Sequence, residues 1–151
     1  LTVTGNRVEW NSTAGFKLVN GCAVNITGNY FDRTFGPALW FGDKNGARFS
    51  DVTVSSNFFY RGGCPDHNDF TDEYEGSHIL FDGAANVTLT GNSFKIGEND
   101  GGGGSKSPEY GIVVRNSDVI AATSNVFKNG YLREKIVWDN VGDCVFENNL
   151  G

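Results

Sequence analysis

Apolar and polar residues alternate in short segments along the whole chain, which is the pattern of half-buried β-strands. In one such segment the alternation directs Val87, Leu89 and Phe94 inward and Thr88 and Thr90 outward. Glycine and asparagine, which favour tight turns, stand where these segments end. Few stretches favour a long helix. The sequence therefore predicts an all-β protein of short strands and excludes a helical bundle.

The strand and its turn form a repeat. Aligned copies place an asparagine at the same position, 23 to 35 residues apart, at Asn6, Asn29, Asn57, Asn92 and Asn125, and a sixth copy reaches Asn149. A unit this small cannot bury its apolar face alone, so the copies must stack into a solenoid of parallel strands.

A second apolar block lies between the copies, at residues 16–18, 39–41, 79–81, 112–114 and 136–138. In four of five cases the next repeat asparagine follows 11 residues after the block ends. The exception is five residues longer and carries an insertion at residues 43–48. This constant spacing predicts a fixed geometry of about five to six rungs.

Stacking makes two columns of identical residues. The asparagines are expected to take the left-handed conformation at a sharp turn and to bond from rung to rung. Consecutive Cα atoms in the asparagine column should lie within about 7 Å, since neighbouring strands are about 4.8 Å apart. An interior column is expected parallel to it, made of Phe31, Phe59, Phe94 and Phe127.

Net charge, hydropathy and cysteine content restrict the possible classes of function. A net charge of −6 argues against non-specific nucleic-acid binding, and no apolar run is long enough to insert into a membrane. The absence of methionine indicates that residues 1–151 are one segment of a longer chain. Three cysteines cannot form a complete disulfide framework. We expect all three to be unpaired, with Cys22 and Cys144 buried and Cys64 in an exposed loop.

The Gly-Asn-x-Phe turns resemble the asparagine ladder of the right-handed parallel β-helix in the pectate-lyase-like superfamily, which includes phage tailspike polysaccharide depolymerases. The resemblance implies an all-β, right-handed, single-stranded parallel β-helix over the whole chain. It assigns the block at 16–18 and its equivalents to the first sheet, residues 24–27 and their equivalents to the second, and Tyr30 and Phe31 to the third. It also implies a substrate groove on the outer face of the first sheet.

On that face an unusually apolar row is expected to point outward: Lys17, Trp40, Leu80, Val113 and Val137. Two interpretations stay open. Long loops or another subunit could cover the row, or the row could be the floor of a sugar-binding groove in which Trp40 stacks on a sugar ring.

Titratable residues flank this row. Asp82, Arg115 and Asp139 fall on consecutive rungs, either as a salt ladder or as the carboxyl pair of an inverting glycosidase. His78 and Lys135 lie two residues before Leu80 and Val137 of the row and are expected beside the substrate, as is Lys17. Arg115, Lys135 and Lys17 would be the candidate bases of a lyase.

The loop at residues 60–76 is the densest cluster of candidate groups. It contains five carboxylates, His67 and Tyr74, and it should roof the first sheet just before His78. Asp69, Asp72 and Glu73 are its catalytic candidates and Tyr74 its substrate-binding one. Asp66, Asn68 and Asp72 are compatible with Ca2+ but lack EF-hand spacing, and no residue is assigned as a metal ligand. The alternative is a solvated acidic loop.

The leading hypothesis is a segment that binds and cleaves a bacterial surface polysaccharide, or another acidic or neutral polysaccharide, in a phage tailspike. Such a protein would be a homotrimer on the virion, and the hypothesis requires no cofactor. A secreted bacterial polysaccharide lyase, hydrolase or epimerase is the second hypothesis. A non-catalytic adhesin or structural β-helix is the third.

Overall fold

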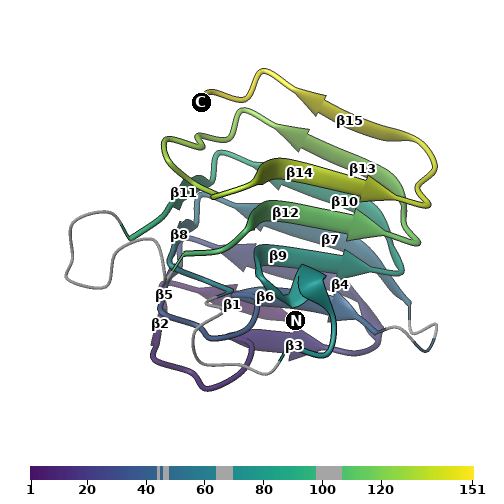
Figure 1. Ribbon diagram of the computed structural model, residues 1–151. Coiled ribbons are helices and arrows are strands. Elements are labelled where there is room, and N and C mark those ends of the chain that lie inside the picture. Colours follow the sequence, from purple (N-terminus) through teal and green to yellow (C-terminus); the bar gives the residue numbers. More distant parts are fainter. Residues whose placement is uncertain (44, 46–47, 64–69, 98–106) are drawn as a thin grey trace.

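The computed structural model describes residues 1–43, 45, 48–63, 70–97 and 107–151, and strands wind through them as a solenoid (Figure 1). We number its three sheets in the order in which each rung passes through them. The first sheet contains β3 (Phe16–Leu18), β6 (Leu39–Gly42), β9 (Ser77–Asp82), β12 (Tyr110–Arg115) and β14 (Glu134–Asp139). The second contains β1 (Thr2–Thr4), β4 (Gly21–Thr27), β7 (Phe49–Ser55), β10 (Ala84–Thr90), β13 (Asp118–Thr123) and β15 (Cys144–Glu147). The third contains β2 (Arg7–Glu9), β5 (Tyr30–Asp32), β8 (Phe58–Tyr60) and β11 (Ser93–Lys95).

All the strand pairs are parallel, and each strand pairs with its equivalent in the next rung. The predicted alignment of the repeats is therefore the observed register: Val87 pairs with Val52 and Ile120, and Ile79 pairs with Leu39 and Ile112. The all-β class, the number of rungs and the assignment of the segments to three sheets are confirmed.

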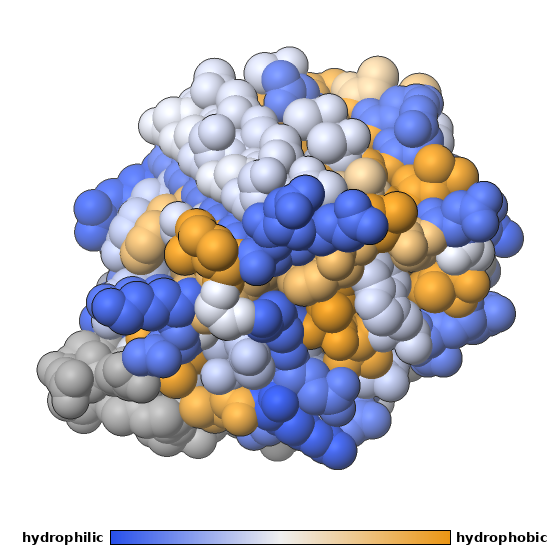
Figure 2. All heavy atoms as spheres, turned by 90° about the horizontal axis from the view of Figure 1, so that it is seen from above, coloured by the Kyte–Doolittle hydropathy of each residue, from blue (hydrophilic) through white to orange (hydrophobic). Residues whose placement is uncertain are grey.

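The core runs along the axis between the sheets. Its residues are the inward positions of each strand, such as Ile26, Leu89, Ile79 and Val114, all fully buried. In the view along the axis from the C-terminal rung, hydrophobic side chains are visible between polar ones (Figure 2). The apolar side chains of this rung pack on the core but stay half-buried, because no described strand lies above β14 and β15.

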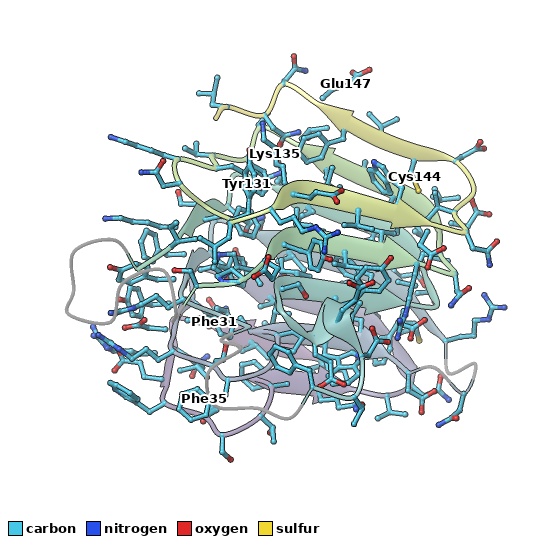
Figure 3. All side chains as sticks on the ribbon, in the orientation of Figure 1. Phe31, Phe35, Tyr131, Lys135, Cys144 and Glu147 are labelled. Atoms are coloured by element: carbon cyan, nitrogen blue, oxygen red, sulfur yellow. The ribbon has the colours of Figure 1, made fainter. Side chains whose placement is uncertain are left out.

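The expected phenylalanine column is present. Phe31, which lies inside the solenoid in Figure 3, stacks on Phe59 with ring centroids 5.1 Å apart. Phe94 stacks on Phe59 and on Phe127, at 5.0 and 4.4 Å. Four successive rungs thus each contribute one stacked phenylalanine ring to the core.

The asparagine ladder is confirmed and runs through all six copies. Each Nδ2 donates to the Oδ1 of the next asparagine, for example Asn57 to Asn92 and Asn92 to Asn125, both at 3.0 Å. The backbone N–H of each also donates to that same Oδ1. Asn29, Asn57, Asn92 and Asn125 are buried, so these bonds satisfy polar groups that water does not reach.

The expected conformation of the ladder residues was wrong. The left-handed residue is the one before each ladder asparagine, with φ of 65° at Gly28, 56° at Ser56 and 58° at Ser124. Glycine is frequent there because it adopts positive φ without steric cost. The asparagine contributes its amide bonds rather than a strained backbone.

The cysteines follow the register of the second sheet. Cys22 and Cys144 are free thiols, as expected, but Cys22 is exposed and Cys144 only half-buried. Cys144 occupies the inward column, paired with Ile120, on the last described rung. Cys22 lies directly before Ala23, whose left-handed backbone (φ 54°) bends the strand. The inward positions of the strand begin only after this bend. Cys64 lies outside the described residues.

Candidate functional site on the first sheet

The apolar outer row is covered over its middle rungs. A 3₁₀ turn, η2 (Glu73–Glu75), lies against the outer face of the first sheet beside β9 (Figure 1). Tyr74 from this turn and Tyr110 from β12 pack on Leu80 and Val113, which are fully buried. This confirms that a loop folds back over the row on these rungs.

Arg115 fixes the turn to the sheet. Its guanidinium forms ion pairs with Asp82, at 2.8 Å between Nη2 and Oδ2, and with Asp72. Burial lowers the pKa of Arg115, but the hydrogen bonds and charges of Asp82 and Asp72 outweigh this and raise it. Asp72 also caps η2, because its Oδ1 accepts from the backbone N–H of Tyr74 at 3.0 Å.

The two carboxylates predicted to flank Arg115, Asp82 and Asp139, are therefore not both placed as predicted. Asp139 pairs with Arg115 in strand register but is exposed, and the second carboxylate bound by Arg115 is Asp72 of the loop. Asp82 is 1% exposed and also accepts from Asn116 Nδ2 at 3.0 Å. Because both carboxylates are engaged by the Arg115 guanidinium, Asp72 and Asp82 suit anchoring the turn to the sheet rather than contacting a substrate.

Below the covered rungs, the described residues leave hollows around Trp40. A hollow of about 420 Å³ is lined by seven residues: Thr13, Ala14, Lys17, Gly36, Trp40, Thr71 and Glu75. A smaller one of about 150 Å³ adds Asp43, Asn45, Asp72 and Arg115. We call the two together the Trp40 hollow. Its floor is an aromatic ring and its walls are hydroxyl, carboxylate and cationic groups.

Two contacts order the walls of the Trp40 hollow. The Lys17 ammonium lies 3.4 Å from the centroid of the Trp40 ring, a cation–π contact. Thr71 Oγ1 donates to Glu75 Oε1 at 2.8 Å. Glu73 points elsewhere: its Oε2 accepts from the Tyr110 hydroxyl at 3.2 Å and lies 3.7 Å from Arg133 Nη1.

A third hollow of about 550 Å³ lies at the corner where the first sheet turns into the second. It is lined by Asp43, Arg48, Asp82, Asn116, Asn140 and neighbouring turn residues. Asp43 lines both this hollow and the Trp40 hollow. The open surface therefore follows β6, from Gly36 before the strand to Asp43 after it.

The structure contradicts the outward positions expected for His78 and Lys135. His78 is fully buried, with its ring centroid 5.6 Å from that of Phe94, and Lys135 Nζ donates to the carbonyl of Gly151 and lies near Phe127. In β9 the strand register pairs Ser77 and Ile79 but not His78, and in β14 it pairs Glu134 and Ile136 but not Lys135. These two residues lie at a corner of the solenoid, where the alternation of inward and outward side chains is interrupted.

Burial has a strong effect on His78. Desolvation lowers the pKa of its imidazole from 6.5 to about 3. The ring is therefore neutral at physiological pH. It belongs to the core rather than to a substrate site.

Sequence reasoning missed several residues of the Trp40 hollow. Thr71 and Glu75 belong to the acidic loop that was singled out, but Asp69, Asp72 and Glu73 were chosen there. Asp43 and Asn45 belong to the insertion that breaks the regular spacing, which was a signal without an assigned role. Asp69, His67 and the Ca2+ candidates Asp66 and Asn68 lie outside the described residues.

The described residues contain no group of three or more His, Cys, Asp or Glu side chains arranged to hold a metal ion. None of their helices is long and apolar enough to cross a membrane.

The family model described as "Right handed beta helix region" matches residues 1–150, which is nearly the whole chain. No solved structure matches the chain significantly.

Proposed function

The chain belongs to the right-handed β-helix family, and from this premise we propose that it binds a polysaccharide in the Trp40 hollow. The observation that carries the proposal is the half-buried indole on the floor of an open hollow. Sugar rings present apolar C–H faces that pack on aromatic rings, and their hydroxyls need the polar partners that Thr13, Thr71 and Glu75 supply.

The lining charges favour a neutral ligand over a strongly acidic one. Asp43, Asp72 and Glu75 face two cations, Lys17 and Arg115, and Arg115 is already shared between Asp72 and Asp82. An added carboxylate would meet more negative than positive charge. Lys17 would leave the Trp40 face, or slide along it, when a sugar ring stacks there.

Binding is tested with a Trp40→Ala variant of the intact protein on an array of bacterial surface polysaccharides. Truncation of a central aromatic anchor costs about 2 kcal/mol or more, which is about 30-fold in affinity. Trp40→Phe keeps a ring and should retain most of the binding. Val145→Ala, an exposed apolar residue on the second sheet, is the matched control. Unchanged binding by a folded Trp40→Ala variant would refute the proposal.

Cleavage of the bound polysaccharide is the second proposal, and the carboxylates of the Trp40 hollow favour it. Glu75 accepts a hydrogen bond from Thr71 and is the candidate general acid or base, with Asp43 as its partner. Loss of an acid or base typically lowers the rate by about 10²- to 10⁴-fold. Glu75→Gln and Asp43→Asn should show this loss, whereas Glu147→Gln on the second sheet should not. Full activity of both variants would show that these two carboxylates do not catalyse cleavage, and only the binding proposal would remain.

The biological setting is proposed on the same basis. A phage tailspike, as a homotrimer on the virion, would use the hollow on a bacterial surface polysaccharide. A secreted bacterial lyase, hydrolase or epimerase would use it on a soluble chain, and an adhesin would bind without cleaving. The free thiols of Cys22 and Cys144 suit assembly in a reducing cytosol and support the tailspike.

A further inference from the structure

We propose that the polysaccharide bound in the Trp40 hollow carries amino sugars, and that the ammonium group of such a sugar takes the place of the Lys17 ammonium on the indole ring. The inference rests on the function proposed above and names its ligand class. An amino sugar is preferred over a neutral sugar of the same backbone. Lys17 is then an internal competitor, because it occupies the position that the cation of the ligand needs.

The position of Lys17 carries the inference. Lys17 on β3 and Trp40 on β6 pair in register, so their side chains are neighbours in the outward column of the first sheet. The Lys17 ammonium lies 3.4 Å from the centroid of the Trp40 ring. In the part of the chain that the structure describes, this ammonium forms no ion pair with a carboxylate. The face of the indole, and not a carboxylate, therefore holds the cation.

The side of the indole away from Lys17 is packed. Trp40 lies against the apolar cluster of Leu80, Tyr110 and Val113, and Leu80 is its partner on the next rung. Leu80 lines neither part of the Trp40 hollow, whereas Lys17 lines both. The ring surface next to the hollow is therefore the surface on which a cation already lies.

A carboxylate stands beside this ring surface. Glu75 is half-buried and lines both parts of the Trp40 hollow, as Trp40 itself does. Thr71 Oγ1 donates to Glu75 Oε1 at 2.8 Å, which orients the carboxylate. An ammonium group on the indole would therefore have a carboxylate within the same hollow, and the two contacts favour the same charge on the ligand.

The second cation of the hollow does not oppose this preference. Arg115 lines the smaller part, but its guanidinium forms ion pairs with both Asp72 and Asp82. One guanidinium and two carboxylates together add no formal positive charge to the walls. The charge that a bound ammonium group must displace is therefore that of Lys17.

An amino sugar combines the groups that this surface can bind. Its ammonium group on an exposed indole face adds about two- to fivefold in affinity. Its ring hydroxyls can bond the hydroxyls of Thr13 and Thr71, which line the same hollow. The lysine side chain of a peptide would supply the cation without the hydroxyls, and an acidic sugar would bring a carboxylate next to that of Glu75.

The test compares oligosaccharides of one β-1,4-linked backbone that differ only at carbon 2, namely oligomers of glucosamine, N-acetylglucosamine and glucose. Calorimetry with the intact protein measures affinity at a pH at which glucosamine carries its proton. We expect the glucosamine oligomer to bind about fivefold or more tightly than the other two. High salt should reduce this advantage, because it screens charges at the surface. A lysine oligomer, the peptide probe, should bind more weakly than the glucosamine oligomer.

Variants separate the contributions of the walls. Lys17→Gln removes the competing cation and should raise affinity for the glucosamine oligomer about two- to fivefold. Lys17→Arg keeps a cation and should not raise it. Glu75→Gln should lower affinity for the glucosamine oligomer by up to about fivefold and leave that for the glucose oligomer unchanged. Glu147→Gln makes the same change at an exposed position on the second sheet and is the matched control.

The outcomes distinguish this inference from the function on which it rests. Equal affinity for the three oligosaccharides, lost in Trp40→Ala, would overturn the preference for amino sugars and keep polysaccharide binding. Tighter binding of the lysine oligomer, or unchanged affinity in Lys17→Gln, would also overturn the inference. If Trp40→Ala binds the glucosamine oligomer as tightly as the wild type, both the inference and the proposed function fail. Melting temperatures of the Lys17 and Glu75 variants should match that of the wild type, because these side chains lie at the surface of the sheet.

Discussion

At the scale of single residues, His78 combines an interior position with a titratable ring. Its pKa of about 3 in the folded protein lies below the value of 6.5 in the unfolded chain. Well above pH 6.5 the ring is neutral in both states, so His78 adds no pH dependence to stability there. Below pH 6.5 the unfolded chain gains a proton that the folded ring does not, so stability falls as the pH falls.

This difference predicts acid sensitivity well above the range of the carboxylates. Between pH 6.5 and pH 5, His78 should remove about 2 kcal/mol from the free energy of unfolding, at about 1.4 kcal/mol per pH unit. His78→Leu should flatten this dependence, whatever its effect at neutral pH. Urea unfolding at pH 7 and pH 5 measures both slopes. Parallel slopes for the wild type and the variant would contradict the buried neutral ring.

The ladder asparagines are the second case at this scale. Asn92 is buried, and its side chain bonds Val54, Asn57 and Asn125 in the rungs on either side. Asn92→Ala leaves several buried groups unpaired, each costing about 1–3 kcal/mol, so a loss of about 3 kcal/mol or more is expected. Asn6→Ala, at the exposed end of the ladder, should cost under about 1 kcal/mol. Chemical unfolding of the two variants gives the comparison, and similar losses would mean that the ladder does not stabilise the interior rungs.

At the scale of elements, Arg115 joins η2 to the first sheet. Arg115→Ala leaves Asp82, 1% exposed, without its cation, and loss of one partner of a buried pair costs about 3–5 kcal/mol. It also releases Asp72 and with it the turn that covers Leu80 and Val113. Asp139→Ala, which changes an exposed side chain on the neighbouring strand, should cost less than about 0.5 kcal/mol.

Chemical unfolding measures the loss of stability, and limited proteolysis measures the release of the turn. The Arg115→Ala variant should be cleaved faster near residues 70–76, because the turn loses its ion pair. If Asp139→Ala destabilises as much as Arg115→Ala, the carboxylate expected from the sequence, and not Asp72, is the energetic partner.

Elements set by repetition could be predicted from the sequence. The ladder asparagines and the column from Phe31 to Phe127 follow from the period alone, because every rung repeats the same packing problem. His78 and Lys135 could not be placed, since the corner before the first sheet skips a pairing position that alternation does not reveal. Arg115 was assigned to a column, but its partner Asp72 comes from a loop without a repeat, whose path depends on tertiary packing on Leu80.

At the scale of the whole molecule, two outer faces of one solenoid carry different side chains. The first sheet presents Trp40 beside hydroxyl, carboxylate and cationic groups, and the third presents aromatic rings with cations packed on them. A stacked backbone allows this, because alternation separates the outer columns from the core and each sheet repeats its own column.

The direction of the open surface gives the last prediction. η2 and Tyr110 cover the first sheet from β9 onward, so a ligand in the Trp40 hollow cannot run up the solenoid axis. It should lie along β6 instead, between Thr13 at one end and Asn45 at the other.

Variants at the two ends should therefore lose affinity in a length-dependent manner. Thr13→Ala and Asn45→Ala should weaken long oligosaccharides and leave the shortest bound fragment unaffected, whereas Trp40→Ala should weaken all lengths. Val137 lies on β14, two strands above β9, which the turn covers. Val137→Ala is therefore the control for a ligand that runs along the axis. Calorimetry with oligosaccharides of increasing length measures this dependence. A crystal soaked with the longest one shows the direction of the bound sugar chain. Loss at Val137 with no loss at Thr13 or Asn45 would show that the sugar chain follows the axis, because only a ligand crossing the rungs could reach β14.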